Sequence, residues 1–338
     1  MYHTIAIAAL FFGFSQTARA ETPFTPDSFH AAQKNGEKIL LHFQADWCPT
    51  CRTQKEKLAG LAKAGVLSGV TFFSVDYDKE TEFKRELEVT AQSTLVAFRG
   101  ALETGRLTGA TDNKVLMEFI EKNLTALTLT RQLELMQAAS SQRLPPEKKK
   151  IMEGAVEKLR ASHLAQKALK AGRQMPDFSL PDSRGKTVKL KDLLKSGPVI
   201  LTFYRGSWCP YCNAQLASYQ EHLGEFKAKG AQLIGVTPEK PDLTALMQEG
   251  KKLEFTILSD AGNKLAKRLG LVFGVPEELK KLYLQFGIDL EKSQGNPDWE
   301  LPVPATYVVR KDGKIIYAFV DPDYTRRADP EDILKVLK

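Results

Sequence analysis

Two short cysteine motifs, each placed directly after an apolar run, constrain this chain more than any other feature. They read WCPTC at residues 47–51 and WCPYC at residues 208–212, and they contain all four cysteines of the 338 residues. Proline favours the first position of a helix, so each motif predicts a helix with the preceding cysteine as its N-cap. The apolar runs at 39–43 and 199–203 predict buried strands. Each motif therefore marks a junction between a strand and a helix.

Cysteines at such a junction are suited to redox chemistry. The free N–H groups and positive end of a helix favour thiolate over thiol, which predicts reactive thiolates at Cys48 and Cys209. Cys51 and Cys212 follow one turn later and can close a disulfide within each pair. Side chains three residues apart on a helix have Cβ atoms roughly 5–6 Å apart, whereas a disulfide requires about 3.8 Å. Each disulfide is thus expected to be readily reduced.

Two other uses of the cysteines fit the spacing poorly. Four-cysteine zinc sites usually have their pairs roughly 15–20 residues apart, whereas Cys51 and Cys209 are separated by half the chain. A structural disulfide closing so short a loop removes little chain entropy. Three histidines, His30, His163 and His222, have no metal-like spacing to one another or to the cysteines. The sequence therefore predicts two dithiol–disulfide centres without metal or cofactor.

His42 lies on the strand that precedes the first motif. A buried histidine there could accept the proton of Cys51, because imidazole titrates near neutral pH. It could equally be a half-buried strand residue with a backbone partner. Both interpretations of His42 remain open from the sequence.

The first 20 residues have the pattern of a signal peptide. A short apolar run at 4–14 is followed by polar residues and by Ala18-Arg19-Ala20, which fits a small-residue cleavage site. The run is too short to span a bilayer. We expect an exported protein, periplasmic or secreted, without stable membrane insertion. Export would place the thiols in an oxidising compartment.

Composition argues against a nucleic-acid partner. The chain has 43% hydrophobic and 26% charged residues and a net charge of +7, as in ordinary globular proteins. Its lysine clusters, at 148–150, 251–252 and 280–281, contain no interleaved aromatic residues that could stack on bases. We interpret these clusters as solvated helix faces.

The order of predicted elements indicates an α/β protein with two similar domains. Residues 21–125 read as βαβαββα, which predicts a mixed sheet with helices on both sides. Residues 126–174 are helical and charged, with Pro145-Pro146 dividing them into two helices. Residues 175–338 repeat the strand–helix alternation and contain an apolar insertion at 272–300. We therefore expect two tandem domains of one fold, the second preceded by a helical extension.

The first domain resembles the thioredoxin family. The resemblance rests on FQADWCPTC at 43–51 and on STLVAF at 93–98, and it implies the thioredoxin fold. The family places a cis-proline where this chain has Ser93 and usually an aspartate where it has His42.

Residues 127–338 resemble the AhpC/TSA peroxiredoxin-like family. The matching segments are FYRGSWCPYC at 203–212, ILSD at 257–260, PATY at 304–307 and DPDY at 321–324. The family's usual motif is Pro-x-x-x-Thr-x-x-Cys, but Thr202 and Gly206 stand at its proline and threonine positions. Pro304 stands near the position of the family's arginine, as a cis-proline of thioredoxin type. Ser207 and Arg205 are the candidates to supply the missing hydrogen bond and positive charge.

Together the resemblances imply an exported antioxidant peroxidase fused to its own reductant. Cys209 would attack a hydroperoxide, Cys212 would form a disulfide with it, and Cys48 and Cys51 would reduce that disulfide. An external dithiol donor would then reset the first domain. Thiol–disulfide interchange with exported proteins remains an alternative, supported by Pro304. A redox-sensing binding module, with the 272–300 insertion as its surface, is a second alternative.

Overall fold

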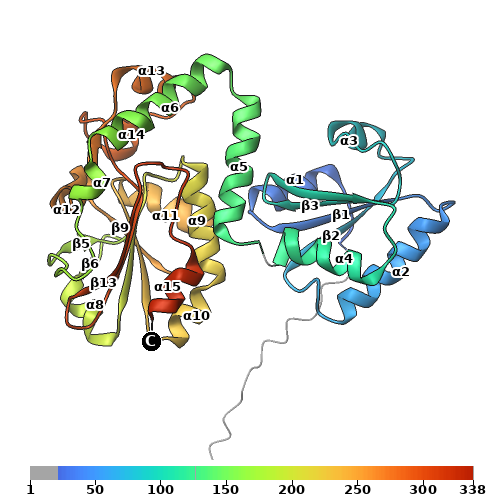
Figure 1. Cartoon of the computed structure of the whole chain (residues 1–338), viewed down its shortest axis with the longest axis horizontal. Coiled ribbons are helices and arrows are strands. Elements are labelled where there is room, and N and C mark those ends of the chain that lie inside the picture. Colours follow the sequence, from blue (N-terminus) through green and yellow to red (C-terminus); the bar gives the residue numbers. More distant parts are fainter. Residues whose placement is uncertain (1–21, 126, 338) are drawn as a thin grey trace, which may run out of the picture. The chain divides into compact units, whose positions relative to one another are not determined.

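The computed structural model describes residues 22–125 and 127–337, and the chain divides into two compact units between Ala126 and Leu127. We call them unit 1 and unit 2 and describe each by itself (Figure 1). The predicted signal peptide at 1–20 lies outside the described residues. Within the described part of the chain, no helix is both long and apolar enough to cross a membrane.

Unit 1 is built on a four-stranded mixed sheet in the order β2-β1-β3-β4. β1 runs parallel to β2 and antiparallel to β3. The predicted βαβαββα order is confirmed, with an additional first helix that starts at the N-cap Thr25. The elements are α1 (Pro26–Lys34), β1 (Lys38–Gln44), α2 (Pro49–Lys63), β2 (Val70–Asp76), α3 (Thr81–Glu86), β3 (Thr94–Arg99), β4 (Leu102–Thr108), α4 (Asn113–Ile120) and the π-helix η1 (Glu121–Thr125).

Alternation along β1 divides the core of unit 1 into two layers. Ile39, Leu41 and Phe43 join the cluster that contains Phe29 of α1 and Phe83 of α3. Leu40 points to the other face, where it joins the cluster of α2 and α4. His42 shares the face of Leu40, since side chains two residues apart lie on one side of a strand. The strand thus directs His42 toward α2, the helix that carries the cysteines.

Unit 2 contains a five-stranded mixed sheet in the order β13-β12-β7-β8-β9. Two short antiparallel ribbons, β5–β6 and β10–β11, lie outside it. The strands are β5 (Ser179–Pro181), β6 (Thr187–Lys189), β7 (Val199–Phe203), β8 (Gln232–Thr237), β9 (Thr256–Ser259), β10 (Val272–Gly274), β11 (Glu300–Pro302), β12 (Ala305–Val309) and β13 (Ile315–Val320). The helices are α5 (Leu129–Arg143), α6 (Pro146–Ala161), α7 (Leu164–Lys167), α8 (Leu190–Ser196), α9 (Pro210–Glu221), α10 (Leu223–Ala228), α11 (Pro241–Gly250), the 3₁₀ turn η2 (Ala261–Asn263), α12 (Lys264–Arg268), α13 (Glu277–Gln285), α14 (Leu290–Gln294) and α15 (Pro330–Val336).

The helical extension belongs to unit 2 and supplies part of its core. Leu129 and Leu133 of α5 are buried in the same cluster as Tyr211 and Tyr219 of α9. α6 packs beside α13 of the apolar insertion, as Figure 1 shows, and Ala155 joins the insertion's cluster. Extension and insertion therefore form one wall of unit 2.

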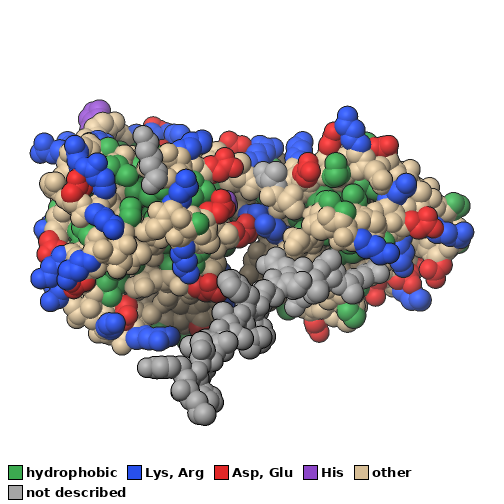
Figure 2. All heavy atoms as spheres, turned by 90° about the horizontal axis from the view of Figure 1, so that it is seen from below, with side chains coloured by type: hydrophobic (Ala, Val, Ile, Leu, Met, Phe, Trp, Pro, Cys, Tyr) green, Lys and Arg blue, Asp and Glu red, His purple; other side chains and the backbone are tan. Residues whose placement is uncertain are grey.

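Charged side chains of both signs are mixed on the molecular surface. On the face that Figure 2 shows, described lysines and arginines lie among aspartates and glutamates. Most described ion pairs join residues three or four positions apart in the sequence, such as Lys149 and Glu153 on α6. Such a surface is consistent with the interpretation of the lysine clusters as solvated faces.

Candidate thiol redox sites

The first cysteine pair lies at the start of α2 in the expected geometry. Cys48 is the N-cap, and its Sγ accepts a hydrogen bond from the backbone N–H of Cys51 at 3.2 Å. The hydroxyl of Ser93 lies 3.4 Å from the Sγ of Cys48 and 3.0 Å from the Sγ of Cys51. Both cysteines are buried and unpaired. Ser93 thus contacts both reactive sulfurs.

Hydrogen bonding favours the thiolate at Cys48. Burial alone would raise the pKa of Cys48, but hydrogen bonds from the Cys51 thiol, the Ser93 hydroxyl and backbone N–H groups lower it overall. Burial raises the pKa of Cys51, and its hydrogen bond to Cys48 raises it further. The resting pair therefore consists of a nucleophilic Cys48 and a protonated Cys51, as the motif predicts.

His42 is completely buried, and neither ring nitrogen has a hydrogen-bond partner among the described residues. The half-buried alternative with a backbone partner is therefore wrong. Burial lowers the pKa of His42 to about 4, and the nearby Gln54 amide opposes this shift only in part. The imidazole is thus neutral near pH 7, and its unprotonated ring nitrogen can accept a hydrogen bond or a proton on the side of β1 that faces α2.

The buried His42 makes the stability of unit 1 depend on pH. Its folded pKa of about 4 lies below the usual 6.5, so the unfolded state binds the proton first as the pH falls. The stability that depends on neutral His42 is complete above about pH 6.5 and is lost toward pH 4. We expect His42→Leu to lessen the destabilisation between pH 7.5 and pH 5 by about 2 kcal/mol. Hydrogen exchange of the β1 and α2 peptides, measured in the parent and in His42→Leu at each pH, gives this difference. If the stabilities of the two proteins fell equally between pH 7.5 and pH 5, the expectation would be contradicted.

The second cysteine pair lies between two buried arginines. The Nη1 of Arg205 lies 4.0 Å from the Sγ of Cys209, and the Nη2 of Arg327 lies 3.3 Å from the Sγ of Cys212. The two cysteines are 1% and 0% exposed, respectively. Arginine remains protonated even when buried, so both guanidinium groups stabilise negative charge on the pair.

The electrostatics of this pair differ from the expectation for Cys209. Cys209 is the N-cap of α9, but its side chain forms no capping hydrogen bond. Burial and donation to Cys212 raise the pKa of Cys209. Although burial opposes it, the hydrogen bond from Cys209 and the charge of Arg327 place the pKa of Cys212 well below its usual range. These shifts, together with the shorter distance from Arg327 to Cys212 than from Arg205 to Cys209, favour the thiolate on Cys212 and the proton on Cys209.

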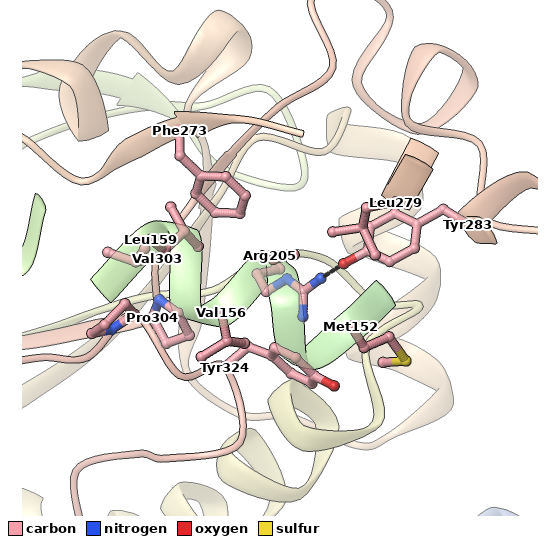
Figure 3. A pocket seen from close by; sticks show the side chains of 12 residues that line it. Met152, Val156, Leu159, Arg205, Phe273, Leu279, Tyr283, Val303, Pro304 and Tyr324 are labelled. Atoms are coloured by element: carbon pink, nitrogen blue, oxygen red, sulfur yellow. Dashed lines mark hydrogen bonds between the residues drawn. The ribbon is translucent and has the colours of Figure 1, made fainter. Parts of the chain in front are cut away.

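Arg205 connects this pair to a small cavity (Figure 3). Its guanidinium donates to the hydroxyl of Tyr283, as Figure 3 shows. It also stacks on the rings of Trp208 and Tyr324. The cavity measures about 20 Å³, enough for a molecule about the size of water. It is lined, besides Arg205, mainly by apolar side chains of α6, the insertion and the Val303–Pro304 segment.

Pro304 therefore lines the cavity beside Arg205, but not in the conformation expected from the resemblance. The described residues contain no cis peptide bond. The expectation of a cis-proline of thioredoxin type at Pro304 is wrong. In the sheet, Pro304 directly precedes β12, whose Ala305 pairs with Phe203 at the end of β7.

Ser207 is held by a buried carboxylate that sequence reasoning missed. Its backbone N–H and its hydroxyl donate to the two carboxylate oxygens of Glu239, at 2.7 and 2.9 Å. The Ser207 hydroxyl is thus engaged by Glu239 rather than by a thiol. Burial raises the pKa of Glu239 to about 7. Glu239 follows β8, more than 25 residues from the motif, so no local pattern indicated it.

Gly206 explains why the family's threonine is absent here. Its φ is +155°, and a Cβ at this position would lie 2.3 Å from Nε1 of Trp208 and 3.0 Å from the Glu239 carboxyl carbon. Both the backbone and the space therefore require glycine. The Ser207–Glu239 contact takes the place that a longer side chain at Gly206 would need.

A buried polar network anchors the segment that carries Arg327. The hydroxyl of Tyr219 on α9 donates to the carbonyl of Ala328 at 2.9 Å, and Gln215 donates to the hydroxyls of Tyr219 and Thr202. Thr202, at the family's proline position, is therefore part of this network. Arg327 itself was missed by sequence reasoning because it lies over 100 residues from the motif.

The two tryptophans of the motifs have opposite environments. Trp47 is 62% exposed, with its Nε1 donating to Asp78. Trp208 is half-buried against Arg205 and Tyr283. The first centre thus presents a large apolar surface beside Cys48, whereas the second is enclosed. Among the described residues, no group of three or more His, Cys, Asp or Glu side chains could hold a metal.

Comparison with known proteins identifies both units. Residues 21–122 match the thioredoxin family model, and residues 171–318 match that of the AhpC/TSA family. Peroxiredoxin Bcp of Escherichia coli K12 is 29% identical over 150-odd residues, covering 45% of this chain and 86% of that protein. Peroxiredoxin Q of Triticum aestivum chloroplasts is 32% identical, covering 44% of this chain and 58% of that protein.

A solved structure shows a similar match over one half of the chain. Peroxidoxin BcpB from Mycobacterium tuberculosis has 23% sequence identity and a TM-score of 0.40, covering 50% of this chain and 96% of that one. The two family matches follow each other in the order that the motifs predict. The chain is an oxidoreductase that carries a thioredoxin domain and an AhpC/TSA-family domain in tandem.

Proposed function

We propose that this protein is a thiol peroxidase in which unit 2 reduces hydroperoxides and unit 1 returns electrons to it. The observation that carries the proposal is the buried pair Cys209–Cys212 between Arg205 and Arg327. Positive charge fixed in a water-poor site stabilises thiolate and the negative charge that develops on a leaving oxygen. The cavity beside Arg205, at about 20 Å³, disfavours a bulky hydroperoxide.

The proton arrangement of the pair supports a two-step reaction. Cys212 thiolate accepts the proton of Cys209 as the Sγ of Cys209 attacks one peroxide oxygen and the O–O bond breaks. Cys209 becomes a sulfenic acid, and the leaving hydroxide takes the proton from Cys212 to form water. The restored Cys212 thiolate then attacks the Cys209 sulfur, releasing hydroxide and forming the disulfide. The pair loses two electrons, and the peroxide gains them.

Reduction of this disulfide is assigned to Cys48. A tethered donor reaches roughly millimolar effective concentration when the linker allows contact. Cys48 has the lowered pKa that a nucleophile requires. The exposed Trp47 beside it can pack against the surface of a partner protein or domain. Cys51 then displaces the partner, and an external dithiol resets the unit 1 disulfide. We place the reaction outside the cytoplasm, on the basis of the signal-peptide pattern predicted at 1–20.

Disulfide interchange with other exported proteins is a second candidate. The exposed Trp47 favours it, because unit 1 can meet any protein disulfide of suitable shape. Gly206, in place of the family's threonine, also departs from the usual peroxide site.

Stopped-flow measurement of hydrogen peroxide consumption by the fully reduced chain separates the two candidates. We expect consumption that is faster than that of a free cysteine by a factor of more than about 10³, since fixed charge and proton transfer both contribute. In Cys209→Ser the fast phase should vanish, whereas Cys48→Ser should retain it for one turnover. Consumption at the free-thiol rate would contradict the peroxidase and favour disulfide interchange.

A further inference from the structure

The residue at the thioredoxin family's cis-proline position carries a hydroxyl between the two sulfurs of unit 1. Ser93 Oγ lies 3.0 Å from the Sγ of Cys51 and 3.4 Å from the Sγ of Cys48, and Ser93 is 2% exposed. These contacts come from the loop before β3, 42 residues from Cys51. A hydroxyl both donates and accepts, so it can bond to a thiol and a thiolate at once.

We propose that Ser93 relays a proton during thiol–disulfide exchange in unit 1. At rest, the Cys51 thiol has one proton, which it can donate directly to Cys48 or to Ser93 Oγ, while the Ser93 hydroxyl donates to the Cys48 thiolate. This arrangement keeps one proton and one negative charge on the pair and assigns the charge to Cys48. The proposal rests on the assignment of unit 1 as a thiol–disulfide exchange domain.

The same chain of contacts serves the resolving step. When Cys48 is bound to a partner sulfur, the Cys51 proton passes to Ser93 Oγ while the Ser93 hydroxyl proton passes to the departing partner sulfur. The Cys51 Sγ attacks the Cys48 Sγ, the bond from Cys48 to the partner breaks, and the partner leaves as a thiol. The Cys48–Cys51 disulfide forms, and Ser93 ends with its hydroxyl restored. Two electrons pass to the partner sulfur.

The backbone places this hydroxyl in an unusual conformation. Ser93 has φ of +57°, which side-chain-bearing residues adopt at a cost. Its carbonyl accepts a hydrogen bond from the N–H of Gly109 at 2.9 Å, which anchors the loop on the far end of β4. Because glycine tolerates positive φ, a glycine at position 93 removes the hydroxyl while it relieves the backbone. This gives a control for strain.

The test uses the full chain with Cys209→Ser and Cys212→Ser, so that only the unit 1 thiols react. Alkylation of Cys48 by iodoacetamide is measured against pH in this parent and with Ser93→Ala, Ser93→Gly or Ser93→Thr added. Losing a hydrogen bond to the thiolate should raise the apparent pKa of Cys48 by about one unit and slow alkylation at pH 6 about tenfold. Ser93→Thr, which keeps the hydroxyl, should restore most of the rate.

A second readout addresses the proton relay itself. Cys48 is loaded with glutathione or with the aromatic thiol thionitrobenzoate, and release by Cys51 is followed. Ser93→Ala and Ser93→Gly should slow release of glutathione at least tenfold and slow the aromatic thiol less, because the latter leaves readily without a proton. Both defects should fade at high pH, where Cys51 ionises unaided.

The outcomes distinguish the relay from other roles of Ser93. Rates in Ser93→Ala and Ser93→Gly within twofold of the parent would overturn the proposal. A defect in Ser93→Ala that Ser93→Gly lacks would also overturn it, since backbone conformation would then be the cause. Neither measurement involves peroxide, so failure of the peroxidase assignment leaves this test intact. Failure of even the parent to release glutathione would instead refute unit 1 as an exchange domain.

Discussion

Peroxide treatment of the Cys51→Ser variant will convert most of the chain into an internal mixed disulfide between Cys48 and Cys209. Without Cys51 the mixed disulfide cannot be resolved in the forward direction and only Cys212 can reverse it, so the intermediate that is transient in the parent accumulates. Cys48 keeps its Sγ at the N-cap of α2, and its attack on unit 2 remains intramolecular. Peptide mapping under non-reducing conditions will detect the Cys48–Cys209 link, in a yield above about half.

Two matched variants and a dilution series are the controls for this trapping experiment. Cys48→Ser with Cys51→Ser should form only the Cys209–Cys212 disulfide, and Cys51→Ser with Cys209→Ser should form no link to unit 2 under peroxide. Dilution should leave the yield unchanged, because the linker rather than concentration sets the encounter rate. Links that form only between separate chains, or no link at all, would refute the internal relay.

Replacing Gly206 with threonine, the residue usual in the family, will damage unit 2 rather than improve it. The new Cβ would meet Trp208 and Glu239, at 2.3 and 3.0 Å, in a backbone conformation that favours glycine. Overpacking and backbone strain each cost about 1–3 kcal/mol. We expect a loss of about 3 kcal/mol in the free energy of unfolding of unit 2, measured by urea denaturation, together with loss of peroxide consumption.

Gly224 provides the comparison for this substitution. It lies on α10, and a Cβ there would meet nothing within 4 Å, so Gly224→Ala should leave stability unchanged or increase it slightly. If Gly206→Thr unfolded at the same urea concentration as the parent, the segment around Trp208 would be able to rearrange. The family's motif would then be compatible with this site.

Local patterns were sufficient to predict most of the fold. Proline after Cys48 and after Cys209 placed the starts of α2 and α9 correctly, because proline at the first helical position is a local preference. The tandem architecture followed from two such junctions. The first helix, α1, was missed because it is a short, largely polar segment of nine residues that buries only Phe29 and Ala32.

The candidate sites were predictable only where sequence neighbours form them. Arg205 lies near Cys209 in the sequence and was identified. Glu239 follows β8, which pairs with β7, and Arg327 lies in the loop between β13 and α15, so only the fold brings these two residues to the site. The thiolate at Cys212 was likewise unpredictable, since it depends on Arg327 and on the hydrogen bond from Cys209. Ser93 was noted only as a departure from proline, and its contact with both sulfurs required the fold.

Leu129 and Leu133 are buried in the same cluster as α9, so the smallest segment that can fold as unit 2 includes α5. A gene fragment beginning near residue 171, where the family match starts, would encode a sheet whose active-site helix has lost an apolar cover. Recombination that transfers unit 2 to another protein must therefore carry the sequence from residue 127 onward. The helices α5 and α6 are therefore part of unit 2 and not a free spacer.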